Sequence, residues 1–238
     1  MTEEKEHPNK ESIEEYLESF RNASERKRNG LLNGLEERSD ELISLGSNLM
    51  SGFEPNSFDW TAGFILQVIH KTDKKFIKNN LNCDDLSWFN APSEVGFDYS
   101  PLQRYLLNES FEDADRFTSS KLRELAGEKA VKRGYVYFSE VESIPSIDLS
   151  TLDKLWIAYS RGKFGFTVQA KILDSLGGRY DKLWPRIGWK KDGIWTRYPK
   201  AFNWSIEAPN GHMPLVNQLR GVRLMDALLN HKGLIVKS

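Results

Sequence analysis

The chain has 238 residues, of which 39% are hydrophobic and 28% are charged, a composition typical of a globular protein that buries a core. No apolar run approaches the roughly 18 residues that a membrane-spanning helix needs. The acidic, hydrophilic start does not resemble a secretory signal or an Arg/Ser-rich transit peptide, so we expect a cytoplasmic location. Cys83 is the single cysteine, which excludes an intramolecular disulfide and a thiolate metal cluster.

The net charge of −1 conceals an asymmetry along the chain. Residues 1–90 carry 11 Lys and Arg against 17 Asp and Glu, a net charge of −6, whereas residues 181–238 carry 10 against 4, a net charge of +6. Either the solvated faces of the protein differ in sign, or the C-terminal segment meets an anion. The positive charge is too sparse and too little clustered to predict a nucleic-acid partner.

Four helical patterns come first along the chain, and none of them alternates with the period of two that marks a strand. The first pattern opens with a capping box, Ser12 followed by Glu15, and Asn29-Gly30 is the signal expected to end it. The four patterns span about residues 12–29, 31–52, 57–70 and 76–81.

The helical signals stop at residue 82 and return at Pro101. We therefore expect an all-α protein with an N-terminal helix bundle over residues 1–82, a linker over 83–99 and a C-terminal domain over 100–238. Asp148 or Ser150 is the expected cap of the third C-terminal helix. The C-terminal helices are expected near residues 102–106, 111–126, 152–159, 168–176 and 216–229, with residues 179–216 mostly irregular.

The irregular stretch is rich in tryptophan and in basic residues. The tryptophans either pin long loops onto the helices or form a stacking surface with a cationic rim. The second possibility suits a flat aromatic ligand that bears carboxylates, whereas single-stranded nucleic acid would call for a larger basic excess. The residues concerned are Trp184, Trp189, Trp195 and Trp204, interleaved with Arg186, Lys190, Lys191, Arg197 and Lys200.

Three long motifs lie in the C-terminal part: FEDADRFTSSKLRELAG, YFSEVESIPSIDLSTLDKLWIAYSRGKFGFTVQ and LWPRIGWKKDGIWTRYPKAFNWSIEAPNGHMPLVNQLRGVR. Together they resemble the genomes-uncoupled family of tetrapyrrole-binding proteins over about residues 101–225, and the N-terminal module resembles the cyanobacterial members. The resemblance implies a helical core with a concave apolar face, whose sides are long loops around residues 137–149 and 209–220.

The resemblance also implies a function and its partners. The protein would be a non-enzymatic regulator that binds protoporphyrin IX and magnesium protoporphyrin IX and stimulates magnesium chelatase in chlorophyll biosynthesis. The partner would be the large porphyrin-binding subunit of that enzyme. Nothing in the sequence requires a membrane, but a peripheral association with thylakoid membranes through the porphyrin face stays open.

The family motifs assign residues to the ligand. Arg220 and Arg223 of LRGVR are three positions apart, so on a helix they would share one face and meet the propionates. Asn217 would offer an oxygen near the centre of the ring, as a weak ligand only. At one position the chain departs from the family, because Tyr198 replaces a tryptophan and adds a hydroxyl to the stacking face. The residues expected to cover the ring are Phe138, Val141, Ile144, Tyr198 and Leu219.

Two other functions stay open on the sequence alone. Glu140 and His212 could form the acid/base pair of a small-molecule enzyme, although no nucleophile elbow, phosphate loop or metal motif accompanies them. Alternatively, the protein could be a carrier or sensor of haem or of a bilin, with His212 as the axial ligand in the case of haem.

Overall fold

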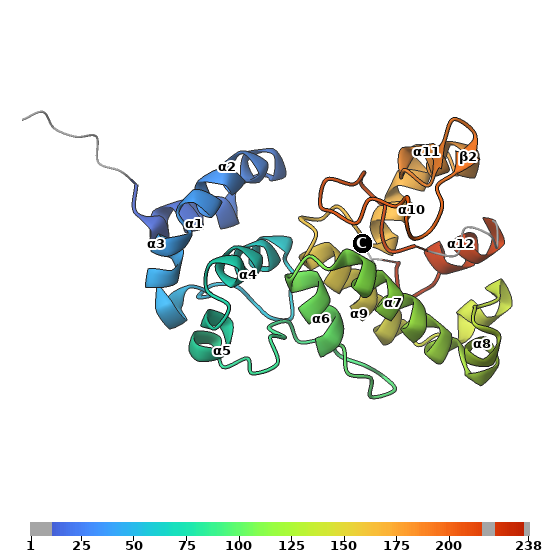
Figure 1. The fold of residues 1–238 in the computed structure, drawn as a ribbon, viewed down its shortest axis with the longest axis horizontal. Coiled ribbons are helices and arrows are strands. Elements are labelled where there is room, and N and C mark those ends of the chain that lie inside the picture. The colour runs from blue at the N-terminus through green and yellow to red at the C-terminus, as the bar shows by residue number, and fades with distance from the viewer. Residues whose placement is uncertain (1–10, 216–221, 236–238) are drawn as a thin grey trace, which may run out of the picture.

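The computed structural model describes residues 11–215 and 222–235, and helices make up most of it (Figure 1). The expected all-α class is confirmed, with one short two-stranded ribbon added to the helices. With η denoting a 3-10 helix, the elements are α1 Ile13–Asn22, α2 Glu25–Glu37, α3 Ser39–Ser44, η1 Gly46–Asn48, α4 Trp60–Thr72, α5 Phe76–Leu81, α6 Ser100–Leu107, α7 Phe111–Ala126, α8 Glu128–Arg133, η2 Phe138–Ser143, α9 Ser146–Ala158, α10 Phe166–Ser175, α11 Tyr180–Arg186, β1 Lys190–Lys191, β2 Ile194–Trp195 and α12 Val222–Leu229.

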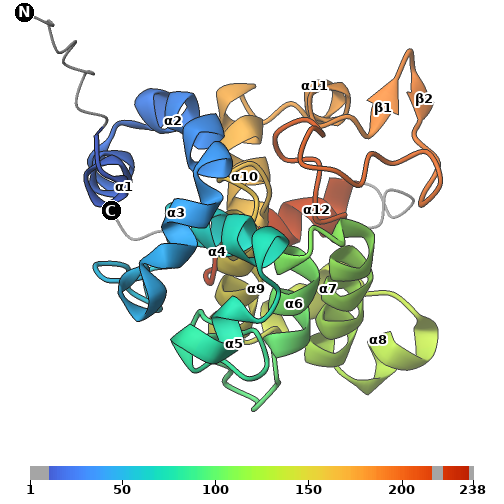
Figure 2. The same cartoon turned by 60° about the vertical axis from the view of Figure 1, so that its left-hand side comes forward.

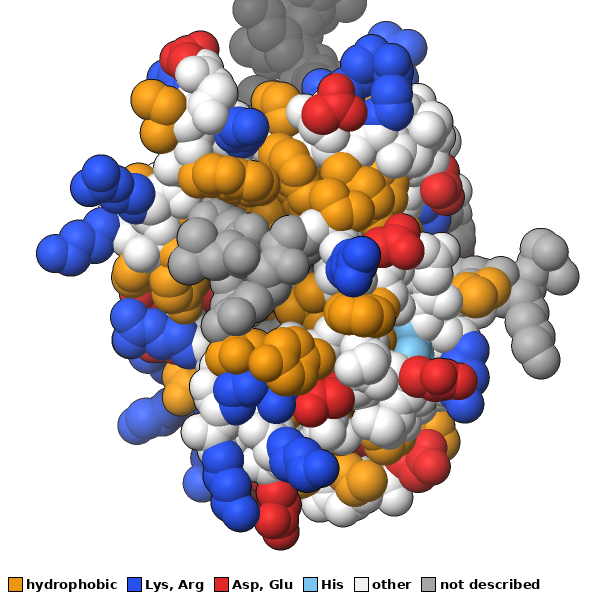
Figure 3. Space-filling model, turned by 90° about the vertical axis from the view of Figure 1, so that its right-hand side faces the viewer, with side chains coloured by type: hydrophobic (Ala, Val, Ile, Leu, Met, Phe, Trp, Pro, Cys, Tyr) orange, Lys and Arg blue, Asp and Glu red, His pale blue; other side chains and the backbone are white. Residues whose placement is uncertain are grey.

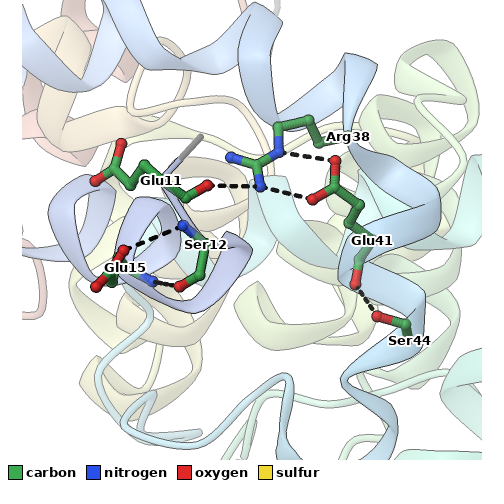
Figure 4. A network of polar contacts seen from close by, with 6 residues as sticks. All are labelled: Glu11, Ser12, Glu15, Arg38, Glu41 and Ser44. Atoms are coloured by element: carbon green, nitrogen blue, oxygen red, sulfur yellow. Dashed lines mark hydrogen bonds and ion pairs between the residues drawn. The ribbon is translucent and has the colours of Figure 1, made fainter. Parts of the chain in front are cut away.

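The first turn of α1 is closed by the predicted capping box (Figure 4). The Ser12 hydroxyl accepts a hydrogen bond from the Glu15 backbone N–H at 3.2 Å, and the Glu15 carboxylate accepts one from the Ser12 N–H at 3.1 Å. Arg38 fastens this end of α1 to α3, because its guanidinium donates both to the Glu11 carbonyl oxygen and to the Glu41 carboxylate.

The predicted end of the first helix at Asn29-Gly30 is wrong. The helix ends at Asn22, because Ala23 and Ser24 take extended backbone conformations, and α2 then continues through both predicted positions. A glycine costs a helix interior only about 1 kcal/mol relative to alanine, so it does not end a helix that its neighbours favour.

The helix α4 is apolar on nearly every side and lies between the N-terminal helices and the pair α6 and α9 (Figure 2). Gly63 lets the α4 backbone touch that of Ala158 in α9, since a Cβ at Gly63 would overlap the Ala158 carbonyl oxygen. The buried Gln67 amide donates to the carbonyl oxygens of Leu106 and Tyr159 at 2.9 and 2.8 Å. The N-terminal helices therefore share a core with the C-terminal ones. The expected division into an N-terminal bundle, a linker and a C-terminal domain stays a prediction.

Residues 83–99 contain no helix or strand, yet they are packed onto the helices. The Phe89 ring is buried against Tyr159, with ring centroids 5.3 Å apart. The backbone of Phe89 also exchanges two hydrogen bonds with the Gln103 side chain, at 3.0 and 2.9 Å. This segment is thus an ordered connection and contributes to the core.

The expectation that Asp148 or Ser150 caps α9 is wrong. The helix begins earlier, at Ser146, and the Asp148 carboxylate lies buried within its first turns. Instead of capping, it accepts hydrogen bonds from the Tyr99 hydroxyl at 2.8 Å and from the Glu94 backbone N–H at 2.9 Å. Asp148 therefore ties residues 83–99 to α9.

Residues 179–216 are more regular than expected, because they contain α11 and the antiparallel ribbon of β1 and β2. Trp184 and Trp189 stack with ring centroids 5.6 Å apart, and the Trp189 indole N–H donates to the His212 carbonyl oxygen at 2.8 Å. These two indoles hold the segment onto the helices, which supports the bracing role. Trp195, by contrast, stays 37% exposed on the ribbon.

Candidate functional site

A small cavity lies where η2 packs against both α7 and α12. Its volume is about 60 Å³, the room of a few water molecules. Its lining is mostly apolar and consists of Ser119, Leu122, Arg123, Gly134, Tyr135, Val136, Val141, Ile144, Leu215, Leu224 and Leu228.

Two of the predicted ligand residues, Val141 and Ile144, line this cavity, and both are buried. They lie in η2 and directly after it. The expectation of a long loop around residues 137–149 is therefore wrong, because this segment forms η2 and the start of α9.

Glu140 holds η2 in place. Its carboxylate accepts hydrogen bonds from the Tyr137 backbone N–H at 2.8 Å and from the Arg133 guanidinium at 2.5 Å. The Tyr137 N–H is the main reason that the pKa of Glu140 lies below its usual value, with Arg133 adding to the effect. A carboxylate kept ionised in this way serves to fix the segment and is poorly suited to act as a general acid.

Phe138 projects from the same short helix and is 47% exposed. The guanidinium of Arg223, an exposed residue in the first turn of α12, lies 5.6 Å from the centroid of its ring, a cation–π distance. Among the residues that the structure describes, no carboxylate forms an ion pair with Arg223. The predicted positions Asn217, Leu219 and Arg220 lie outside the described residues.

Tyr198 does not line the cavity but is connected to it through Asp115 of α7. Its ring packs on Phe202 and Trp204, and its hydroxyl is close enough to the Asp115 carboxylate to lower the pKa of that group. Asp115 also accepts the Leu215 backbone N–H at 2.6 Å. Complete burial raises the pKa of Asp115 to about 7, although the Leu215 N–H and the nearby Tyr198 hydroxyl lower it. Asp115 thus holds two separate segments against the helix that forms one wall of the cavity.

Arg123 is a site residue that the sequence reasoning missed. It is half-buried on α7 and is the one charged residue among the described residues that line the cavity. The sequence did contain a signal for its position. Ser119, Leu122 and Arg123 stand at i, i+3 and i+4, so they share one face of a correctly predicted helix. What was missing was the knowledge that this face meets η2 and α12.

The two residues of the enzyme alternative belong to separate hydrogen-bond networks. His212 is buried, and its Nδ1–H donates to the Ile187 carbonyl oxygen at 2.7 Å. Its Nε2 is sealed from solvent and has no partner in the described ranges. Burial also lowers the pKa of His212. This geometry favours neither an acid/base pair with Glu140 nor an axial ligand for iron.

Residues 11–215 and 222–235 contain no group of three or more His, Cys, Asp or Glu side chains that could hold a metal ion. Within the same ranges, the helices are too short or too polar for any of them to span a bilayer.

The end of the molecule that carries α8, α12 and the ribbon has a mixed surface. Apolar side chains gather across the middle of this face, with Lys and Arg side chains around them (Figure 3). The large apolar side chains that are exposed on η2, the ribbon and α12 are Phe138, Ile194, Trp195 and Val222. A face of this kind suits a ligand with a broad apolar surface and negative charge.

Known proteins with similar sequences cover the same region. The sequence profile of GUN4-like proteins matches residues 92–232. A Ycf53-like protein of Synechocystis is 44% identical over 170 residues, which make up 71% of this chain and 73% of that protein. A tetrapyrrole-binding protein of Arabidopsis thaliana chloroplasts is 38% identical over 142 residues, 56% of this chain and 54% of that protein.

Two solved structures are also similar. GUN4 from Chlamydomonas reinhardtii matches with a TM-score of 0.58 and 36% identity, over 63% of this chain and 99% of that one. The ligand-free GUN4 of Arabidopsis thaliana matches with a TM-score of 0.54 and 37% identity, over 61% and 99% of the two chains. Because the family profile spans more than half of the sequence, and the cavity with its three elements lies inside the matched range, the chain belongs to the GUN4-like family of proteins.

Proposed function

We propose that this chain binds protoporphyrin IX and magnesium protoporphyrin IX on the face around the cavity, and that it stimulates magnesium chelatase without catalysing a reaction itself. The main support is one arrangement, in which the exposed Phe138 ring lies under the Arg223 guanidinium, beside an apolar cavity. The name of the Arabidopsis relative, a tetrapyrrole-binding protein, fits the same class of ligand.

The arrangement suits a flat macrocycle that carries carboxylates at one edge. Covering its apolar area is favourable by roughly 25 cal/mol per Å², and the Phe138 ring offers a surface for this. A propionate requires a cation that keeps its charge, which arginine does, and Arg223 is exposed and close by. The cavity of about 60 Å³ is far too small for the ring, so the ring would lie across the outer face. Val141 and Ile144 would then contact a substituent of the ring.

The side chains that could serve as axial ligands to a metal in the porphyrin are compatible with a protein that serves a chelatase. Such a protein must hold both a metal-free substrate and a magnesium product, so it should not depend on a strong axial ligand. The described residues contain no cluster of metal-binding side chains, and the Nε2 atom of His212 is sealed from solvent. The assignments of Asn217, Leu219 and Arg220 to the ligand stay predictions.

The proposed partner is the large porphyrin-binding subunit of magnesium chelatase, in the cytoplasm or at the surface of thylakoid membranes. The apolar side chains exposed on the same face, Phe138 and Trp195 among them, are of the kind that supports a peripheral membrane contact. Sedimentation with anionic lipid vesicles, with and without porphyrin, would test this part separately.

Binding can be tested by titrating the full chain with deuteroporphyrin IX and with its magnesium form while following tryptophan fluorescence. We expect saturable quenching with both ligands. A tetracationic porphyrin of similar ring size is the control, and it should bind more weakly because its charges oppose the arginines. If neither dicarboxylate porphyrin gives saturable quenching, the proposal is wrong.

The regulatory role requires a second experiment with purified chelatase subunits and ATP. We expect the chain to accelerate magnesium insertion into deuteroporphyrin IX in the presence of all the subunits. The chain mixed with porphyrin, Mg²⁺ and ATP alone should form no product. Product formation in that mixture would show that the protein is an enzyme.

A further inference from the structure

Arg123 occupies an unusual position for a charged residue. It lies on α7, half-buried, and the other lining residues in the described part of the chain are apolar or neutral. Its guanidinium donates a hydrogen bond to the Ser119 hydroxyl of the preceding turn at 2.9 Å. A hydroxyl offers this cation a dipole but no opposite charge.

Three nearby cations have carboxylate partners, whereas Arg123 has none among the described residues. Arg116 pairs with Glu112 at 2.5 Å, and Lys121 pairs with Glu124 at 2.7 Å. On α8, Arg133 likewise pairs with Glu140 of η2. Within the described residues, Arg123 has no carboxylate at ion-pair distance. Taking a cation partly out of water without an anion is unfavourable, so a ligand that supplies a carboxylate here gains that interaction.

The size of the cavity decides which part of a ligand can enter it. A volume of about 60 Å³ holds a few atoms, which excludes an aromatic macrocycle but admits a short carboxylate arm. The apolar part of the lining, which includes Val141, Ile144 and Leu228, would contact the methylene groups of such an arm.

We propose that Arg123 binds a carboxylate arm of the ligand inside the cavity. The inference rests on the proposed porphyrin-binding function and adds to it a second cation, on a different helix from Arg223. A ligand with two carboxylates would then be held by α7 at one arm and by α12 at the other. The site would accordingly select dicarboxylate porphyrins over esters with the same ring.

The test compares two ligands that differ only in charge, deuteroporphyrin IX and its dimethyl ester, in the same detergent buffer. Tryptophan quenching would be measured for the full chain and for Arg123→Gln, Arg123→Lys and Arg104→Gln. Arg104 is the matched control, because it is also a half-buried helical arginine without an ion pair in the described residues, and it contacts Asp85 and Ser100 instead of the cavity. We expect Arg123→Gln to weaken binding of the diacid about tenfold and to leave binding of the ester unchanged. Arg123→Lys should keep part of the preference for the diacid over the ester, and Arg104→Gln should keep all of that preference.

Two results would overturn the inference while the proposed function stands: unchanged diacid binding in Arg123→Gln, or equal weakening of the diacid and the ester. The second result would mean that Arg123 only maintains the fold. If circular dichroism shows that Arg123→Gln is unfolded, Arg123→Met is used in its place, because methionine keeps an apolar stem in the cavity lining. If the unmodified chain binds neither ligand, the proposed function fails and this inference fails with it.

Discussion

The guanidinium of Arg223 lies over the ring of Phe138, 5.6 Å from its centroid, and this contact joins α12 to η2. The family motifs assign Arg223 to the carboxylates of the ligand and Phe138 to its ring. Their contact means that each supports the position of the other, since the ring holds the guanidinium by a cation–π interaction. Their effects on ligand binding should therefore be coupled.

The first prediction concerns this pair. Arg223→Ala should weaken binding of a dicarboxylate porphyrin by about 1 to 3 kcal/mol, the range for a charge-assisted hydrogen bond. The loss should shrink at high salt because ions screen the exposed charge. Phe138→Ala should weaken binding through lost apolar contact, with little dependence on salt. Titrations at low and high salt separate the two effects.

The double variant of Arg223 and Phe138 should cost less than the sum of the single variants, because contacting residues are not additive. Arg26→Ala is the control, an exposed arginine on α2 in the N-terminal part. If Arg223→Ala binds the porphyrin as tightly as the unmodified chain does, the carboxylate-bearing edge of the ligand contacts another part of the protein. The basic segment around Arg197 and Lys200 would then be the better candidate.

The second prediction concerns Asp115, whose pKa rises from 3.8 to about 7 because it is fully buried. Between these values the folded protein holds a proton that the unfolded chain has released. The free energy of unfolding should therefore fall as pH rises from about 4 to 7 and level off above that. Glu112 strengthens the shift, while Arg116, Tyr198 and the Leu215 N–H oppose it.

Asp115→Asn removes this titration and retains an oxygen that can accept the Leu215 N–H. Relative to the unmodified chain, the variant should gain on the order of 2 to 3 kcal/mol of stability between pH 5 and pH 8. Urea unfolding at several pH values measures the difference directly. A stability difference that does not change with pH would show that Asp115 is ionised in the folded protein.

The third prediction compares two helical glycines. Gly63→Ala should destabilise the protein by at least about 2 kcal/mol, because the added methyl group would overlap the Ala158 backbone, which cannot move as a side chain can. Gly30→Ala on α2 meets no atom within 4 Å and should stabilise the protein by roughly 0.5 to 1 kcal/mol. Thermal unfolding of both variants measures these changes. Equal effects would mean that α4 and α9 do not touch as described.

The fourth prediction concerns the domain division. A fragment of residues 98–238 should fold and bind porphyrin, because the two solved relatives match 63% and 61% of this chain with 99% of theirs. The fragment should be less stable than the full chain, since it loses α4 and the hydrogen bonds from Gln67 to Leu106 and Tyr159. Circular dichroism and tryptophan quenching test the two properties. An unfolded fragment, or a folded one that does not bind, would disprove the division.

The fifth prediction addresses the haem alternative. His212→Gln should leave the absorbance of bound ferric haem unchanged, because the Nε2 atom is sealed from solvent and Nδ1–H is bonded to the Ile187 carbonyl oxygen. The variant should lose stability, since this bond and the packing on Phe202 are disturbed. A Soret band that is sharp in the unmodified chain and disappears in the variant would support a haem protein instead.

The sequence by itself determined the local structure where signals lie within a few residues of one another. The helix α7 has the predicted bounds, because the apolar period runs from Phe111 to Ala126 and Gly127 ends it with a positive φ. The capping box at Ser12 likewise sets the start of α1. The long motifs were sufficient to identify the family, and with it the class of ligand that we propose.

Only the tertiary structure decided which helix faces meet, because contacts between distant segments depend on how the whole core packs and not on local spacing. Asp148 has the sequence signal of a helix cap, but the burial of α9 directs its carboxylate to Tyr99 and Glu94. From its spacing alone, Arg123 resembles any other surface cation on a helix, and only the packing of α7 with η2 and α12 places it in the lining of a mostly apolar cavity. The contact between Arg223 and Phe138 has the same origin, since it forms where α12 packs against η2.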